Sequence, residues 1–298
     1  MKYLMTLMMI CLLQGNDGTF DIYIFPAFYS KNVSDYLLQN NCSVAHLLTQ
    51  SMIDPDKDQQ PDLDAVKKHT AELYPDANAT GLFVVDWEGQ AFNDLRKYDK
   101  GDSRFKAAED AYVRLVSAIK EYRPGLKVGV YGLPFRSFSD AQRAGNADTK
   151  LDGLLSKCDV LTPSLYIMYT NEEVGEQRNM DYLKQNMDQF LSYGARLKKQ
   201  VIPFFWYKVH PSNKKYGMNV MPKGNVQKYL SLLSTYSNQA GKINGIIWWE
   251  GGEKIGKTPA AQKGLGVSAA GTGVPTAETA RDSIIINYTA PFIKKKQQ

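Results

Sequence analysis

Two carboxylates stand two residues apart at the end of a buried-strand pattern. The apolar run from Leu82 to Val85 leads directly into Asp86, Trp87 and Glu88. Because side chains alternate along a strand, Asp86 and Glu88 point to one side, with roughly 7 Å between their Cα atoms, and Trp87 points to the other. Carboxylates are costly to bury without partners. The pair therefore predicts acid–base chemistry in a cleft, although acidic residues are also common wherever a strand meets a loop.

Aromatic residues recur at the ends of other predicted strands. Aromatic rings pack against the apolar faces of sugars, and phenol hydroxyls hydrogen-bond to sugar substituents. Each aromatic residue alone could instead belong to the core, but their shared position beside an acid pair favours a sugar-binding cleft. These candidates are Tyr131, Tyr166, Tyr207 and Trp249.

Strand and helix patterns alternate along the chain without a composition break, which is typical of one α/β domain with a parallel sheet. Helices are expected at 34–51, 62–73, 102–122, 172–199 and 225–239, with Asp62 and Asp102 as caps of the second and third. A weaker helix is expected to end at Lys157, and a last helix is expected to start near Pro275. Strands are expected at 20–29, 80–88, 127–134, 159–166, 200–207 and 244–249. An open doubly wound sheet fits the alternation as well. A closed (β/α) TIM-like barrel of six or seven strands, spanning residues 19–298, is favoured because barrel strand ends converge on one face.

The composition excludes several classes of function. The 298 residues carry a net charge of only +5, and no arginine-rich helix suggests that the chain binds nucleic acid. No Gly-x-Gly-x-x-Gly fingerprint follows the first strand, and no Cys/His spacing suggests a metal site. We therefore expect neither a cofactor nor a metal.

The N-terminus resembles a secretory signal peptide over residues 1–18, with Lys2, an apolar run and a polar exit. The run is too short to span a membrane, so no stable membrane insertion is expected; a buried first strand or helix is the alternative reading. Secretory targeting would make the protein secreted or lysosomal and would allow Cys42 and Cys158 to pair as a disulfide. Four glycosylation sequons agree with it, at Asn32, Asn41, Asn78 and Asn287.

Four segments in order resemble motifs of the hyaluronidase glycoside hydrolases. Gly-Leu-Phe-Val-Val-Asp-Trp-Glu, ending at Glu88, is similar to their catalytic strand Gly-Leu-Ala-Val-Ile-Asp-Trp-Glu. The segments 127–134, 161–166 and 245–249 are similar to Leu-Trp-Gly-Phe-Tyr-Gly-Phe-Pro, Leu-Tyr-Pro-Ser-Ile-Tyr and Gly-Val-Val-Leu-Trp. The resemblance covers roughly residues 80–250. It implies a distorted barrel with about seven strands and a retaining, substrate-assisted, endo-acting hydrolysis of N-acetylhexosamine polymers of the hyaluronan or chondroitin type.

The resemblance also implies unequal roles for the two acids. Glu88 would be the acid and then the base, and Asp86 would orient the acetamido group of the substrate. An ionised Asp86 would raise the pKa of Glu88 and keep it protonated. Tyr166, Tyr207 and Trp249 would fall on or near the aromatics of the sugar cleft. The expected partner is a polysaccharide, bound by a monomer.

The chain departs from the family pattern at Gly89–Phe92, at Phe135–Ser137 and at Thr162. The acid pair is retained, but the residues that are expected to contact the substrate around it differ from those of the family. Two further interpretations therefore stay open. One is a catalytically impaired carbohydrate-binding relative, and the other is a barrel glycosidase that acts on chitin-type glycans.

Overall fold

The structure is a computed structural model that describes residues 20–40, 42–143, 146, 149–251 and 275–292. The predicted signal peptide, residues 1–18, lies outside the described residues, and so does Asn41. The other three sequon asparagines, Asn32, Asn78 and Asn287, lie within them.

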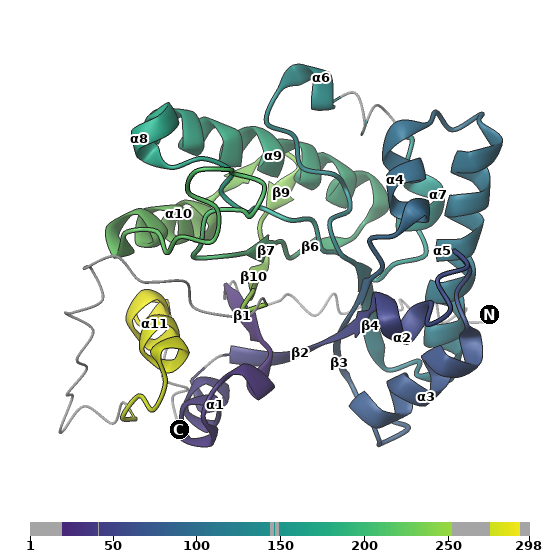
Figure 1. The fold of residues 1–298 in the computed structure, drawn as a ribbon, viewed down its shortest axis with the longest axis horizontal. Helices are drawn as coiled ribbons and strands as arrows, with labels where there is room; N and C mark the ends of the chain where they lie inside the picture. The colour runs from purple at the N-terminus through teal and green to yellow at the C-terminus, as the bar shows by residue number, and fades with distance from the viewer. Residues whose placement is uncertain (1–19, 41, 144–145, 147–148, 252–274, 293–298) are drawn as a thin grey trace, which may run out of the picture.

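Parallel strands form a curled sheet at the centre of the molecule, with helices around it (Figure 1). The strand order is β4-β3-β2-β1-β10-β7, and all five pairings are parallel. The bounds are Asp21–Ile24 for β1, Cys42–Thr49 for β2, Gly81–Asp86 for β3, Leu126–Val130 for β4, Phe204–Phe205 for β7 and Gly245–Trp248 for β10. Burial on both faces explains why β3 and β10 read as continuous apolar runs.

Short strand pairings connect β4 to β7 and so continue the barrel between the two edges of the six-stranded sheet. Strand β5 (Val160–Leu161) pairs with β6 (Gln200–Val201), and single bridges join Tyr131 to Thr162 and Ser164 to Phe204. Only Ile202 and Pro203 separate β6 from β7, so the two are one barrel strand interrupted where proline cannot donate a hydrogen bond. The predicted distorted barrel of about seven strands is confirmed. A separate hairpin joins β8 (Ser237–Asn238) to β9 (Gly241–Lys242).

The helices cover the outside of the barrel (Figure 1). The predicted caps are confirmed, because the carboxylates of Asp62 and Asp102 accept backbone N–H bonds at the starts of α3 and α5. None of the described helices is long and apolar enough to cross a membrane. The helices are η1 Pro26–Phe28, α1 Lys31–Gln39, α2 Gln50–Ile53, α3 Leu63–Leu73, α4 Gln90–Lys97, α5 Ser103–Tyr122, α6 Asp140–Arg143, α7 Asp152–Leu155, α8 Asn171–Val174, α9 Glu176–Leu197, α10 Lys223–Thr235 and α11 Ala280–Thr289.

The helix predicted over 34–51 is wrong. Helix α1 ends at Gln39, where the Asn40 side chain donates to the Tyr36 carbonyl, and residues 42–49 form the longest barrel strand, β2. The apolar residues of β2 fit a helical spacing too. The segment forms a strand because it pairs in parallel with β1 on one side and with β3 on the other. These pairings provide hydrogen-bond partners for its backbone N–H and C=O groups at the centre of the sheet.

The disulfide considered between Cys42 and Cys158 is not formed, and both residues are buried free thiols. Cys42 begins β2, whereas Cys158 precedes β5, and β3 and β4 lie between these strands. Three strand spacings amount to roughly 14 Å, well beyond the roughly 7 Å that a disulfide can span between Cα atoms.

Candidate active site

A cleft of about 290 Å³ opens at the carboxyl ends of the barrel strands. It contains the acid pair, which comes from the end of β3, and aromatic residues from four other strand ends. Its lining residues are Leu47, Asp86, Glu88, Tyr131, Tyr166, Phe204, Trp206, His210, Pro211, Met218, Trp249 and Gly251. The structure therefore brings together the acid pair and three of the four aromatic residues that the sequence singled out.

A second cavity, of about 470 Å³, lies beside the acid pair. Asp86 and Glu88 line both cavities, and the rest of the second wall is polar and comes from the segment Thr49–Lys57. The two acids thus contribute to the lining of an aromatic cleft and of a second cavity whose other lining residues are mostly polar.

Trp87 fixes the orientation of the two acids. As the alternation of strand residues predicts, it points away from the cleft, where it is only 1% exposed and packs 5.0 Å from the Tyr112 ring of α5. The Tyr112 hydroxyl donates to the Trp87 carbonyl. This buried contact between β3 and α5 holds Asp86 and Glu88 on the open side of the strand end.

The two carboxyl groups titrate as a coupled pair. Burial, and then the negative charge of Glu88, raise the pKa of Asp86 to about 7. Burial in the cleft also raises the pKa of Glu88, while the positive charges of Arg136 and Arg96 oppose that rise. The expectation that Asp86 stays ionised beside a protonated Glu88 is therefore too simple. Both shifts favour the protonated forms, so the pair keeps a proton up to near-neutral pH.

Two tyrosines and a tryptophan line the aromatic half of the cleft. The rings of Tyr131 and Tyr166 lie 6.3 Å apart, and the two phenol groups are close enough to act on each other's pKa. Trp249 follows β10 and is held edge-on by Phe25 at 5.7 Å and by Phe204 at 6.0 Å. These contacts leave rigid aromatic surfaces and a phenol pair facing the acids.

Tyr207 does not lie in the cleft, so the binding role expected for it is wrong. It is fully buried, stacks on Trp248 at 5.7 Å and donates to Oε1 of the buried Glu250 at 2.7 Å. Residues alternate along the strand, so Phe204 and Trp206 face the cleft and Tyr207 faces the opposite side. A shift of one residue in the assumed register accounts for the error.

Three residues of the site were missed. Arg136 follows β4 and donates to Ser164 Oγ and, at 2.8 Å, to His210 Nε2. His210 lines the cleft, and burial and then the charge of Arg136 lower its pKa to about 4, so it is neutral. Arg96 of α4 lies near enough to act on the pKa of Glu88. Nothing in the local sequence marks these residues, since Arg96 and Arg136 look like solvated charges until the fold brings them to the acids.

No group of three or more metal-ligating side chains is found in the described residues. Of the sequon asparagines in that part of the chain, Asn78 is exposed in a turn, whereas Asn32 and Asn287 lie within α1 and α11. The Asn32 amide donates to the Thr276 carbonyl, and the Asn287 amide donates to the Ser283 carbonyl. Asn78 is thus the sequon best placed for modification.

The sequence matches no protein-family model and no curated protein sequence. The structure is similar to bee venom hyaluronidase in complex with a hyaluronic acid tetramer, with 17% identity, a TM-score of 0.58, and coverage of 77% of this chain and 90% of the other. A monoclinic crystal form of bee venom hyaluronidase gives 18% identity, a TM-score of 0.58, and coverage of 78% and 91%. These similarities establish a shared barrel fold.

Proposed function

We propose that the protein is an endo-acting glycoside hydrolase that cleaves an N-acetylhexosamine-containing polysaccharide of the hyaluronan or chondroitin type. The observation that carries the proposal is the acid pair at the end of β3, which lines both a polar cavity and an aromatic cleft that contains Tyr131, Tyr166 and Trp249. The hyaluronic acid tetramer in the similar bee venom hyaluronidase adds support for a polysaccharide substrate.

The mechanism that fits this pair is retaining and substrate-assisted. Glu88 protonates the glycosidic oxygen while the acetamido oxygen of the substrate attacks the anomeric carbon and expels the leaving sugar. Asp86 orients the acetamido group and stabilises the positive charge of the cyclic intermediate. Glu88, now ionised, takes a proton from water as that water opens the intermediate. The cycle needs one proton on the pair at the start, which agrees with the raised pKa values of both groups.

Water-excluding walls support the same assignment. The rings of Tyr166 and Trp206 lie 5.6 Å apart and, with Met218, give the cleft apolar surfaces against which a pyranose ring can pack. A low-dielectric wall also strengthens the interaction of Asp86 with developing positive charge. The signal-peptide pattern at the N-terminus would direct this activity to the secretory pathway.

The proposal is tested by incubating the purified protein with hyaluronan, chondroitin and chitin oligomers and measuring new reducing ends. Cleavage of the first two polymers, with retained anomeric configuration in the first product, is expected. Cleavage confined to chitin oligomers would favour the chitin-type alternative. Binding without any cleavage would instead identify a carbohydrate-binding relative that has lost turnover.

A further inference from the structure

Two arginines line a third cavity beside the acid pair. It has a volume of about 350 Å³ and is bounded by Arg96, Phe135, Arg136, Phe138, Gln142 and Tyr169, among others. Arg136 connects it to the cleft, because its guanidinium lies 5.7 Å from the centre of the Tyr166 ring and bonds to His210. The cavity is therefore adjacent to the predicted point of cleavage.

Neither guanidinium has a carboxylate in ion-pair contact among the described residues. The ion pairs in that part of the chain involve other side chains. Arg96 instead lies over the Phe135 ring at 4.6 Å and over the Phe92 ring at 5.3 Å. Arg136 donates to two neutral groups, Ser164 Oγ and His210 Nε2. Stacking and hydrogen bonding thus hold both cations in place, and the charge of Glu88 acts on them from outside ion-pair distance.

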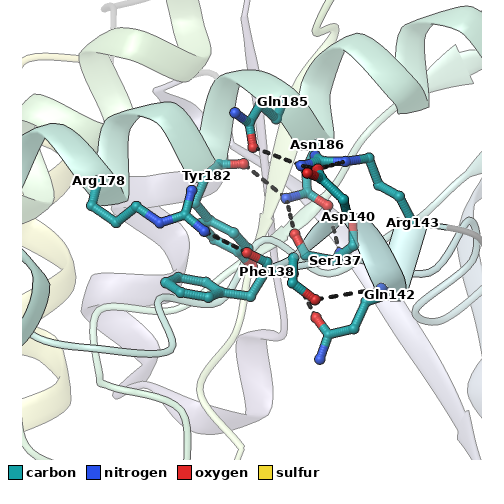
Figure 2. A network of polar contacts seen from close by, with 10 residues as sticks. Ser137, Phe138, Asp140, Gln142, Arg143, Arg178, Tyr182, Gln185 and Asn186 are labelled. Carbon is teal, nitrogen blue, oxygen red and sulfur yellow. Dashed lines mark hydrogen bonds and ion pairs between the residues drawn. The ribbon is translucent and has the colours of Figure 1, made fainter.

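The segment that carries Arg136 is anchored to α9, as Figure 2 shows. The buried Asn186 side chain accepts from the Ser137 N–H and donates to the Ser137 carbonyl, both at 2.8 Å. Arg178 donates to the Phe138 carbonyl at 2.6 Å, and its guanidinium lies 4.5 Å from the centre of the Phe138 ring. The cavity wall is therefore preorganised, and a ligand does not have to order it on binding.

The two positive charges repel each other. Partial burial and this repulsion lower the pKa of Arg96, while the charge of Glu88 partly offsets them. A bound anion would remove the repulsion and would accept hydrogen bonds from two planar guanidinium groups, a geometry that suits the oxygens of a carboxylate or a sulfate.

We propose that Arg96 and Arg136 form an anion subsite that binds the carboxylate or sulfate of an acidic sugar next to the scissile bond. This inference rests on the proposed glycosidase function and assigns to it two residues that select an acidic polymer over a neutral one. Aromatic contacts from Phe138 and Tyr169 would accompany the ring that carries the anion.

Binding of matched oligosaccharides to the Glu88→Gln protein tests the subsite, because that variant is expected to bind without cleaving. The probes are a hyaluronan hexasaccharide, its carboxyl-reduced neutral form, and a chondroitin sulfate hexasaccharide, each measured by calorimetry. Adding Arg96→Gln should weaken binding of the two acidic oligomers about 10- to 100-fold and leave the neutral one unchanged, as expected for a lost charged hydrogen bond. A larger loss for the sulfated oligomer than for hyaluronan would identify sulfate as the anion.

Two controls make the result specific. Arg104→Gln removes the same charge from an exposed arginine that pairs with Asp102 at the start of α5, and it should bind all three oligomers like the parent. Because Arg136 also bonds to Ser164 and His210, it is tested as Arg136→Lys, which keeps the charge, beside Arg136→Gln. The lysine variant should retain more of the acidic preference than the glutamine variant.

The outcomes separate this proposal from the proposed function. Equal weakening for acidic and neutral oligomers, no change in Arg96→Gln, or no binding of acidic oligomers by the parent would overturn the anion subsite. Cleavage of glycans by the wild-type enzyme in any of these cases would leave the glycosidase function standing. Arginine-dependent binding of acidic oligomers, with no cleavage by the wild type, would support the subsite and refute the hydrolase.

Discussion

Replacing Asp86 by asparagine should stabilise the protein at neutral pH. Burial and the charge of Glu88 raise the pKa of Asp86 from its ordinary 3.8 to about 7, so the folded state holds the Asp86 proton more tightly than the unfolded chain does. The contribution of the Asp86 carboxyl group to stability therefore falls as the pH rises from about 4 to about 7, and it is lost above that range. This difference in pKa corresponds to about 4 kcal/mol, an upper limit for the gain in Asp86→Asn at pH 8.

The assay is urea unfolding of wild type and Asp86→Asn at pH 4 and at pH 8. The variant should be more stable at pH 8 by up to about 4 kcal/mol, and the advantage should disappear near pH 4. Because the charge of Glu88 contributes to the raised pKa, the same substitution in a Glu88→Gln background should give a smaller gain. A gain that is independent of pH, or a loss of stability at pH 8, would refute the view that a desolvated carboxylate is held at the end of β3.

Two further predictions concern the proton of the acid pair and the position of Tyr207. The kcat/KM for polysaccharide cleavage should fall about tenfold per pH unit once the pH exceeds the raised pKa of Glu88, because the acid then has no proton to donate, and values that stay constant up to pH 9 would contradict this. Tyr207→Phe should lower the free energy of unfolding by about 1–3 kcal/mol, because the buried Glu250 loses a hydrogen-bond donor, and should leave cleavage unchanged. Urea unfolding and reducing-end assays measure both effects, and lost cleavage in a stable Tyr207→Phe protein would place Tyr207 back in the cleft.

The barrel and the position of its acid pair could be predicted from local patterns. Alternating strand and helix signals, the caps at Asp62 and Asp102, and the apolar run before Asp86 are all properties of neighbouring residues. The strand β2 could not be distinguished from the end of a helix in this way. Its backbone is satisfied by β1 and β3, which lie on either side of it in space.

The candidate site was only partly predictable for related reasons. The side that a strand residue faces depends on register, and one residue separates Trp206 in the cleft from the buried Tyr207. Arg96 and Arg136 come from a helix and from a loop in separate βα units, and their common cavity exists only in the folded barrel. The pKa of Asp86 likewise depends on how deeply the closed barrel buries the end of β3.

Glu88 is the residue proposed to transfer the proton in glycosidic bond cleavage, and one comparison of rates decides whether it does. Initial rates of reducing-end release are measured for wild type and Glu88→Gln on the best substrate of the polymer panel, with matched unfolding midpoints for the two proteins. Loss of general acid–base catalysis should lower the rate about 10²- to 10⁴-fold in Glu88→Gln. A rate within a few fold of the wild type would show that another group carries the proton and that the role assigned to Glu88 is wrong.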